Sequence, residues 1–472
     1  MANISSPGIG SGVDVQSIVS QLVALERSPI KQLQTQASTL QTKLSLYGTI
    51  KSQMSSLADA ASRLASSTTW KAATATSTNT AAVGVTASTG ALSGNYSVQV
   101  QQLARAQSVA STAFAEGASV GTGTLTIEIG QWSGNGFTAG EADAIQIEIG
   151  PGDDTLSAIA ARINAAGSDV RASVLRDANG ERLLVQSAKT GEASGFRITA
   201  ADDDGNPTDA TGLSALAYDA GQGGGMSLAQ SGLNAQAVIN GVTVSSATNQ
   251  LSDVLPGLTL QLSQVTSQPV DVSVDVDKAG ITKNIQALVD AYNTINTTLA
   301  NALKYDQASG KGGTLQGDST AVGLQNALRG MMRSITGSEP FSRLLDVGIE
   351  LQSGGALKID SAKLNAALDN LEGIKSLFMV DTGNASTQGF ALKLKAFAKG
   401  MLDTEGSIST RSNALQEAIT RNTKEQERQE DRVSRVEKRL LAQYTALDTK
   451  MAGFNTLSAF VMQQLSLWNN GS

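Results

Sequence analysis

Paired carboxylates are the first side chains in this sequence that could do chemistry. Glu128 and Glu148 each lie between isoleucines in stretches that alternate apolar and polar residues, and two facing carboxylates can hydrolyse a glycosidic bond. The alternation argues against that role, because it places the isoleucines in a core and both glutamates on the solvent side of predicted strands. We therefore interpret both glutamates as surface residues.

A calcium-binding loop is suggested by three acidic or amide residues but lacks its other parts. Asp202, Asp204 and Asn206 have the spacing that opens such a loop. The glycine required at the sixth position is replaced by Pro207, and the closing acid is replaced by Leu213. We interpret the segment as a solvated acidic turn.

Two glycine-containing segments resemble nucleotide-binding loops without meeting their requirements. In segment 309–312, Gly312 stands where Ser or Thr should follow the lysine, and Tyr305 replaces the first glycine. Segment 8–12 alternates glycine with other residues, but no predicted strand precedes it. We expect both segments to be spacers.

Composition excludes several classes of active site. The 472 residues contain no cysteine and no histidine, so thiol nucleophiles, disulfides, Ser-His-Asp triads and His-ligated zinc are all excluded. There are 42 acidic and 35 basic residues, which gives a net charge of −7 and argues against nucleic-acid binding. Aromatic residues make up only 4%. We expect a structural or interaction protein, without enzymatic activity and without a cofactor or metal.

The three tryptophans do not form a recognisable platform. Trp70, Trp132 and Trp468 are too scattered for stacking bases or sugars. Trp132 lies in the turn-like segment 130–136, where it is either an exposed contact residue or, more commonly, folded onto its own sheet.

No targeting or membrane segment is visible. Residues 1–20 contain no Lys or Arg, so the basic start of a secretory signal is missing. No apolar run approaches the roughly 18–20 residues that span a bilayer. We expect no membrane insertion, and export by a route without a cleavable signal stays open.

The elements that must position these residues follow the order helix, β, helix. Residues 14–28 predict an amphipathic helix with Asp14 as its N-cap, and Pro29 suits the first turn of the next helix. From 33 to 64 the apolar spacing alternates three and four, which is a coiled-coil seam. The seam consists of Leu33, Leu40, Tyr47, Ile50, Met54, Leu57, Ala61 and Leu64.

The middle of the chain alternates at period two. It predicts strands at 96–100, 125–129, 145–149, 237–245, 258–263 and 270–276, one helix at about 154–166, and a hairpin of 170–176 with 182–187. The glycine-rich segment 221–227 predicts a linker.

Helical periodicity returns near Lys278 and continues to the end of the chain. A second seam spans 285–302, and shorter helices are expected around 320–336, 361–371 and 387–402. A long helix then begins near Ser409; 12 of its residues in 420–439 are charged. Its apolar stripe recurs every seven residues at Val433, Leu440, Leu447, Phe454 and Val461.

The predicted fold is a multidomain α+β protein, in which both chain ends build a coiled-coil helical leg around inserted β-rich head domains. We expect terminal helices from 1–40 with 441–472, and a leg domain from 41–70 with 278–440. The plate is expected from 71–115 with 230–277, and an outer head from 116–229.

An apolar seam at each chain end requires a partner. The first helix either pairs with the last one inside the molecule, or helices 14–28 and 450–468 pack against other subunits; periodicity alone leaves both open. The residues expected to contact other copies or a filament are Ile18, Leu22, Leu33, Leu40, Tyr47, Met54, Leu447, Phe454, Leu457, Val461 and Leu465.

One set of motifs is spread in order along the chain. It consists of segments 8–14, 94–98, 239–241, 255–260, 289–293 and 377–378, together with Ile18, Val19, Leu22, Val23, Glu26, Gly348, Ile349, Asp360 and Leu364. These motifs resemble those of one family, the flagellar filament-capping proteins also called hook-associated protein 2. The resemblance covers nearly the whole chain and is weakest at about 116–229.

The resemblance implies a secreted, extracellular protein at the tip of the bacterial flagellum. It implies a ring of identical chains that promotes insertion of flagellin, with hook–filament junction proteins and an export chaperone at the C-terminal helix as further partners. Two alternatives are a secreted adhesin and another flagellar axial protein, such as a junction protein or a flagellin-like filament protein.

Overall fold

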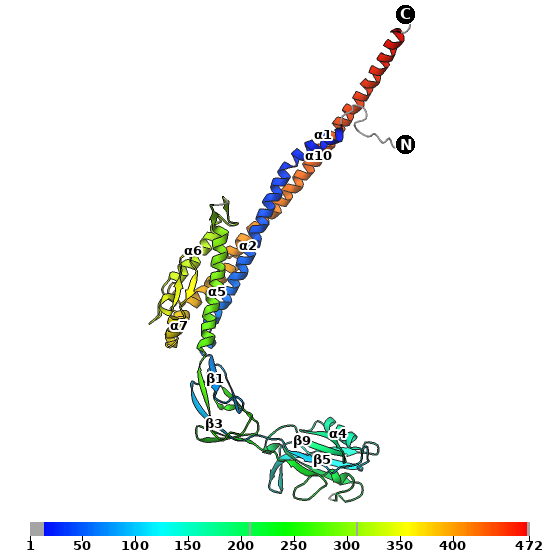
Figure 1. Ribbon diagram of the computed structural model, residues 1–472, viewed down its shortest axis with the longest axis vertical. Helices are drawn as coiled ribbons and strands as arrows, with labels where there is room; N and C mark the ends of the chain where they lie inside the picture. The colour runs from blue at the N-terminus through cyan, green and yellow to red at the C-terminus, as the bar shows by residue number, and fades with distance from the viewer. Residues whose placement is uncertain (1–13, 207–208, 308–309, 470–472) are drawn as a thin grey trace. The chain divides into compact units, whose positions relative to one another are not determined.

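The computed structural model describes residues 14–206, 209–307 and 310–469. The glycine motif at 8–12, Pro207 and Ser309 lie outside the described residues. The chain forms two compact units, one from Met1–Ser67 with Ala279–Ser472 and the other from Thr68–Lys278. The first is mainly helical and the second mainly β (Figure 1), which confirms the predicted fold class of helical chain ends around β-rich domains.

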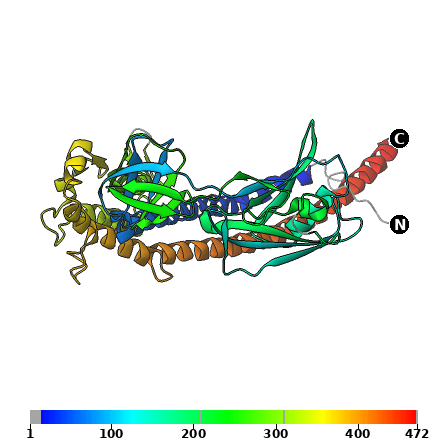
Figure 2. The ribbon, with the colours of Figure 1, turned by 90° about the horizontal axis from the view of Figure 1, so that it is seen from below.

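The first unit consists of helices and three small elements. Its longest helices, α2 and α10, run side by side (Figure 1, Figure 2). The bounds are α1 Val15–Glu26, α2 Ser28–Leu64, α5 Lys278–Leu303, α6 Ser319–Arg333, α7 Ser361–Ala367, α8 Leu371–Met379, α9 Phe390–Leu402 and α10 Ser407–Asn469, with hairpins β17 Tyr305–Asp306/β18 Lys311–Gly312 and β19 Ile349–Leu351/β20 Leu357–Ile359 and the 3₁₀ turn η3 Leu344–Val347.

The first two helices begin and end where their sequence predicts. The side chain of Asp14 caps α1 by accepting a hydrogen bond from the backbone N–H of Ser17 at 2.9 Å. Helix α1 ends at Glu26, and α2 starts at Ser28 with Pro29 in its first turn, where a missing N–H costs nothing.

The predicted seams form the core of this unit. Six seam residues of α2, from Tyr47 to Leu64, are fully buried, and α2 packs on α9 and α10. The seam of α5 is buried along its length, from Ile285 to Ala302.

A buried carboxylate joins three of these helices. Asp318 caps α6 through the N–H groups of Thr320 and Ala321. It also accepts a hydrogen bond from the hydroxyl of Tyr47 on α2 at 2.7 Å, and from Nε and Nη2 of Arg411 on α10 at 3.0 and 2.8 Å. Burial alone would raise the pKa of Asp318, but these hydrogen bonds outweigh it and the pKa is lowered.

The second unit contains two separate apolar cores. The plate core lies among strands of a five-stranded sheet, in the order β1-β16-β3-β12-β13, and a three-stranded sheet, β14-β15-β2. These strands are β1 Ala73–Ser77, β2 Val83–Ala87, β3 Gly94–Gln102, β12 Ala235–Ile239, β13 Val242–Ser246, β14 Gln250–Leu255, β15 Leu258–Leu262 and β16 Val270–Val276; the short helix α3, Ser67–Trp70, precedes them.

The outer-head core is built from two four-stranded sheets and a helix. One sheet has the order β10-β5-β6 with β7 also on β5, and the other has the order β11-β4-β9-β8. The elements are β4 Ser108–Ala110, β5 Gly123–Ser133, β6 Gly136–Ala139, β7 Ile145–Ile149, α4 Leu156–Ala165, β8 Val170–Asp177, β9 Gly180–Ser187, η1 Glu192–Ser194, β10 Gly195–Asp202, η2 Gly212–Leu216 and β11 Ser227–Gln230. The predicted hairpin is β8 with β9, paired from Val170↔Ser187 to Asp177↔Gly180.

The edges of these cores differ slightly from the sequence-based boundaries. Strand β4 begins at Ser108 and pairs with β9, so Val109 contributes to the outer-head core although it precedes residue 116. The four-part division of the chain otherwise stays a prediction.

The glycine-rich segment 221–227 is not a free linker. A Cβ at Gly225 would lie 2.3 Å from the carbonyl oxygen of Ala215, and one at Gly224 would lie 2.4 Å from that of Ala217. The glycines therefore let the backbone pass close to η2, a reason that glycine content alone does not distinguish from flexibility.

Candidate assembly surface

The C-terminal helix α10 is covered over part of its length and bare beyond it. Helix α1 packs on it through Val15, Val19 and Val23, in a cluster with Val433 that Leu440 and Tyr444 border. Ion pairs of Arg27 with Glu430 and of Glu26 with Arg432 flank this contact. Of the two alternatives that periodicity left open, the structure therefore shows the intramolecular one for the first helix.

Beyond Tyr444 the apolar stripe continues without a cover. The described side chains of this surface are Leu447, Met451, Phe454, Leu457, Phe460, Val461, Met462 and Leu465, all exposed, and we call these eight residues the bare stripe. Burying each one in an assembly would contribute roughly 1.5–3 kcal/mol, so the stripe is the strongest candidate contact surface of the first unit.

The bare stripe differs from an ordinary amphipathic surface in two ways. From Met451 to Asn469 the helix carries no charged residue, whereas 420–439 contains twelve. At about 100° per residue, Phe460 lies about 120° around the helix from Phe454, and Met462 about 80° in the other direction. An apolar surface that covers more than half of a helix is typical of a helix that is buried on several sides.

The predicted contact residues fall into three groups in the structure. Leu447, Phe454, Leu457, Val461 and Leu465 are between 48 and 63% exposed and belong to the bare stripe. Ile18, Leu22, Leu33 and Leu40 are half-buried beside the intramolecular contacts of α1 and α2. Tyr47 and Met54 are 0% exposed.

Tyr47 and Met54 correct the sequence-based set. Their seam faces the interior of the unit, and the Tyr47 hydroxyl is held by Asp318. A heptad pattern identifies which residues seek burial but does not identify what buries them, so neither residue has surface to offer another molecule.

Five large exposed apolar residues among the described side chains of α1 and α10 were not in the predicted set. Met451, Phe460 and Met462 belong to the bare stripe, Leu441 is 36% exposed on α10, and Leu25 is 72% exposed on α1. The absence of charge after Lys450 is the sequence signal that could have identified Phe460 and Met462.

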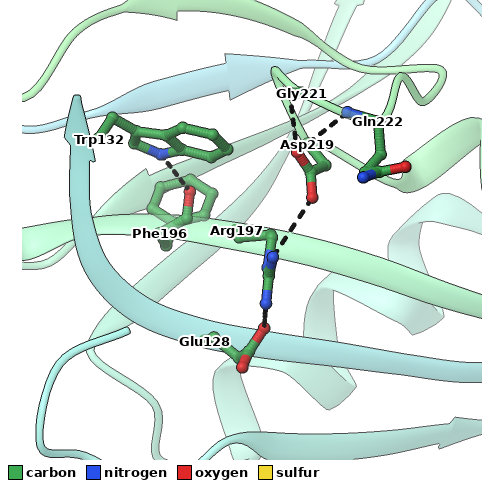
Figure 3. Close-up of polar contacts among 7 residues, drawn as sticks. All are labelled: Glu128, Trp132, Phe196, Arg197, Asp219, Gly221 and Gln222. Carbon is green, nitrogen blue, oxygen red and sulfur yellow. Dashed lines mark hydrogen bonds and ion pairs between the residues drawn. The ribbon is translucent and has the colours of Figure 1, made fainter. Parts of the chain in front are cut away.

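The carboxylates that first suggested chemistry have structural surroundings. Glu148 is exposed, as the alternation predicts. Glu128 is only partly exposed, because Arg197 on the neighbouring strand β10 pairs with it and with Asp219 (Figure 3). Asp219 also accepts hydrogen bonds from the N–H groups of Gly221 and Gln222, so the network fixes a turn.

The other candidate motifs are also part of the fold. The carboxylate of Asp202 accepts a hydrogen bond from the N–H of Ser214, and Lys311 lies in β18, paired with β17. Trp132 is folded onto its own sheet, with its ring centroid 4.9 Å from that of Phe137. Within 14–206, 209–307 and 310–469, no group of three acidic residues is placed to hold a metal.

The apolar end of α10 is not a membrane span by length and hydropathy. Among the helices of the described residues, none is both long and apolar enough to cross a bilayer.

Comparison with known proteins finds matches along nearly the whole chain. Residues 11–107 match the family described as Flagellar hook-associated protein 2 N-terminus, and residues 232–456 match Flagellar hook-associated protein 2 C-terminus. The chain is also 30% identical to the flagellar hook-associated protein 2 of Escherichia coli K12 over 479 aligned positions, which cover 98% of each chain. The chain belongs to the flagellar hook-associated protein 2 family.

Other members support the family assignment and the fold. The B-type flagellar hook-associated protein 2 of Pseudomonas aeruginosa is 29% identical, over 95% of this chain and 94% of its own. The solved structure of the D1-D2-D3 domains of the Escherichia coli flagellar cap protein FliD has a TM-score of 0.62 and 29% identity. It covers 79% of this chain and 99% of its own.

Proposed function

We propose that this protein is a structural cap at the distal tip of the bacterial flagellar filament, outside the cell. The observation that carries the proposal is the match to cap-family proteins over nearly the full chain, together with the bare stripe on α10. Copies of the chain would form a closed ring through head-to-tail contacts, because a repeated rotation closes such contacts without symmetric patches.

The fold supports a mechanism in which the legs hold the filament end. Helix α1 fixes α10 as far as Tyr444, and the bare stripe beyond it is available to neighbouring helical proteins. Flagellin and other copies of the cap would cover it from several sides. Each neighbour would cover only a few of the eight apolar side chains, so that single contacts exchange readily, which would let the ring step as each flagellin is inserted and the filament elongates.

The same stripe suggests how the chain is handled before assembly. A charge-free apolar helix end is prone to associate in the cell, so we propose that the export chaperone covers it there and that hook–filament junction proteins are its first neighbours on the flagellum. The adhesin and the flagellin-like axial protein have no comparable support.

The proposal is tested by placing charge on the bare stripe. In a strain of the native bacterium that lacks this gene, the double variant L457D/L465D is expected to leave flagellin unassembled, whereas the wild-type chain restores filaments. The control T456D/Q463D adds the same charge on the opposite side of the helix and should restore them. Filament length is measured by electron microscopy, and normal filaments with L457D/L465D would overturn the leg-contact mechanism.

A further inference from the structure

The outer head contains a cavity that the cap function does not use. Its volume is about 540 Å³, within the usual range of small-molecule sites. It lies where the β5–β6 hairpin, the turn after Tyr218 and the segment 231–233 meet.

Trp132 forms a rigid apolar wall of this cavity. Its Nε1–H donates a hydrogen bond to the carbonyl oxygen of Phe196 at 3.0 Å (Figure 3), so the indole needs no further acceptor. Tyr218 meets it edge to face, with centroids 5.6 Å apart. The side-chain amide of Gln107 also forms two hydrogen bonds of 2.9 Å with the backbone of Phe196, one as donor and one as acceptor. The ring is therefore held before any ligand arrives.

Polar groups converge on the same space. Asn135 and Gln131 are exposed at the rim, and Glu192 is half-buried with one carboxylate oxygen 3.4 Å from the Gln131 amide. The Tyr218 hydroxyl has no hydrogen-bond partner among the described residues. Burial, and then the charge of Asp219, raise the pKa of Tyr218, so the hydroxyl stays protonated and can donate.

The charge of the lining restricts the ligand. Among the described residues that line the cavity, Glu192 is the only charged one. Arg197, the nearby cation, is held by Glu128 and Asp219. An anionic ligand would meet a carboxylate and no free cation, which leaves neutral and cationic molecules. Amide, hydroxyl and carboxylate groups around an apolar ring favour a neutral ligand with many hydroxyls over an organic cation, which needs several aromatic faces.

We propose that this cavity binds a neutral saccharide of one or two sugar units. The C–H face of a sugar ring would pack on Trp132, and its hydroxyls would hydrogen-bond with Asn135, Glu192 and the Tyr218 hydroxyl. The proposal is independent of the cap function, because neither the bare stripe nor the first unit contributes to the cavity.

Saturation-transfer NMR on the full chain tests the proposal, with N-acetylglucosamine, galactose and mannose as probes and choline as the cationic comparison. At least one sugar should receive magnetisation on its ring protons. Asn135→Ala should weaken that binding by up to about tenfold, because one hydrogen bond to the ligand is lost at the rim of the cavity. Asn179→Ala, in the exposed turn of the β8–β9 hairpin, should leave it unchanged.

The outcomes separate the alternatives. Asn135 follows Gly134 in the hairpin turn and has no positive φ, so alanine is compatible with its backbone, and an unchanged urea midpoint verifies the fold. Binding of no probe sugar, or sugar binding that Asn135→Ala leaves intact, overturns the proposal. Choline binding without sugar binding also overturns it and assigns the cavity to an organic cation.

Discussion

Asp318→Ala is expected to lower the stability of the helical unit more than the loss of a helix cap can explain. In the wild-type chain the carboxylate caps α6, accepts a hydrogen bond from the Tyr47 hydroxyl and accepts two hydrogen bonds from Arg411. Its side chain is 2% exposed, whereas that of Arg411 is 37% exposed. The substitution therefore removes three kinds of contact at one buried point.

The magnitude follows from what each partner can do afterwards. Losing the cap costs about 1 kcal/mol. The buried Tyr47 hydroxyl is left without an acceptor, which costs roughly 1–3 kcal/mol. The Arg411 side chain can reach water, so the loss of its ion pair with Asp318 adds little. We expect the free energy of unfolding to fall by about 3 kcal/mol in total.

Urea unfolding followed by circular dichroism at 222 nm measures this change, because the first unit holds most of the helix. The matched control is Asp360→Ala, since Asp360 caps α7 through Ala362 and Lys363 but has no buried partner. Its effect should be clearly smaller. Equal shifts of the urea midpoint for the two variants would refute the reasoning that the buried cluster stabilises the unit beyond capping.

Three further predictions concern single sites. Because the pKa of Asp318 is lowered by folding, its contribution to the free energy of unfolding is present above its unfolded pKa of about 4 and is lost as the pH falls through the folded value. The difference in urea midpoint between wild type and Asp318→Ala should therefore narrow on acidification. A difference that stays constant with pH would contradict this. Asn422 is 6% exposed and is hydrogen-bonded to glutamines of α2 and α10. Asn422→Leu should raise the free energy of unfolding by about 1 kcal/mol, because a polar residue at a buried coiled-coil position lowers stability. A lower urea midpoint would argue against it. Gly225→Ala should destabilise the outer head by about 2 kcal/mol, because the new Cβ meets the carbonyl oxygen of Ala215. The control is Gly150→Ala, whose new Cβ has open space. Equal unfolding curves for the two variants, followed by tryptophan fluorescence, would count against the close approach.

Local periodicity was sufficient to predict the long helices and several of the strands, but it missed other strands, among them β1, β2 and β10, and it merged β12 and β13 into one strand at 237–245. The seam from Tyr47 to Leu64, the break at Pro29 and the β8–β9 hairpin all depend on neighbours within a few residues. The sequence therefore indicates which side chains seek burial and where helices begin.

The partners of those surfaces are long-range features that periodicity does not contain. Arg197 meets Glu128 only because β10 pairs with β5, and Tyr47 meets a carboxylate 271 positions away. The same limit explains why Tyr47 and Leu447, which each belong to the heptad pattern of a different helix, differ completely in exposure.

The same limit explains why only part of the candidate surface was predicted. The predicted set contained five of the eight residues of the bare stripe but not Met451, Phe460 or Met462, because a helix that is buried on several sides departs from a single seam. The packing of α1 on α10 was one of two open alternatives, and only the three-dimensional structure decides between them.

Electron microscopy of the purified full-length chain tests the central claim most directly. If the protein is a filament cap whose legs seek neighbouring copies, concentrated samples should contain closed rings with one fixed number of subunits, and L457D/L465D should shift them towards single chains. Open helical polymers, or single chains only at every concentration, would contradict the account.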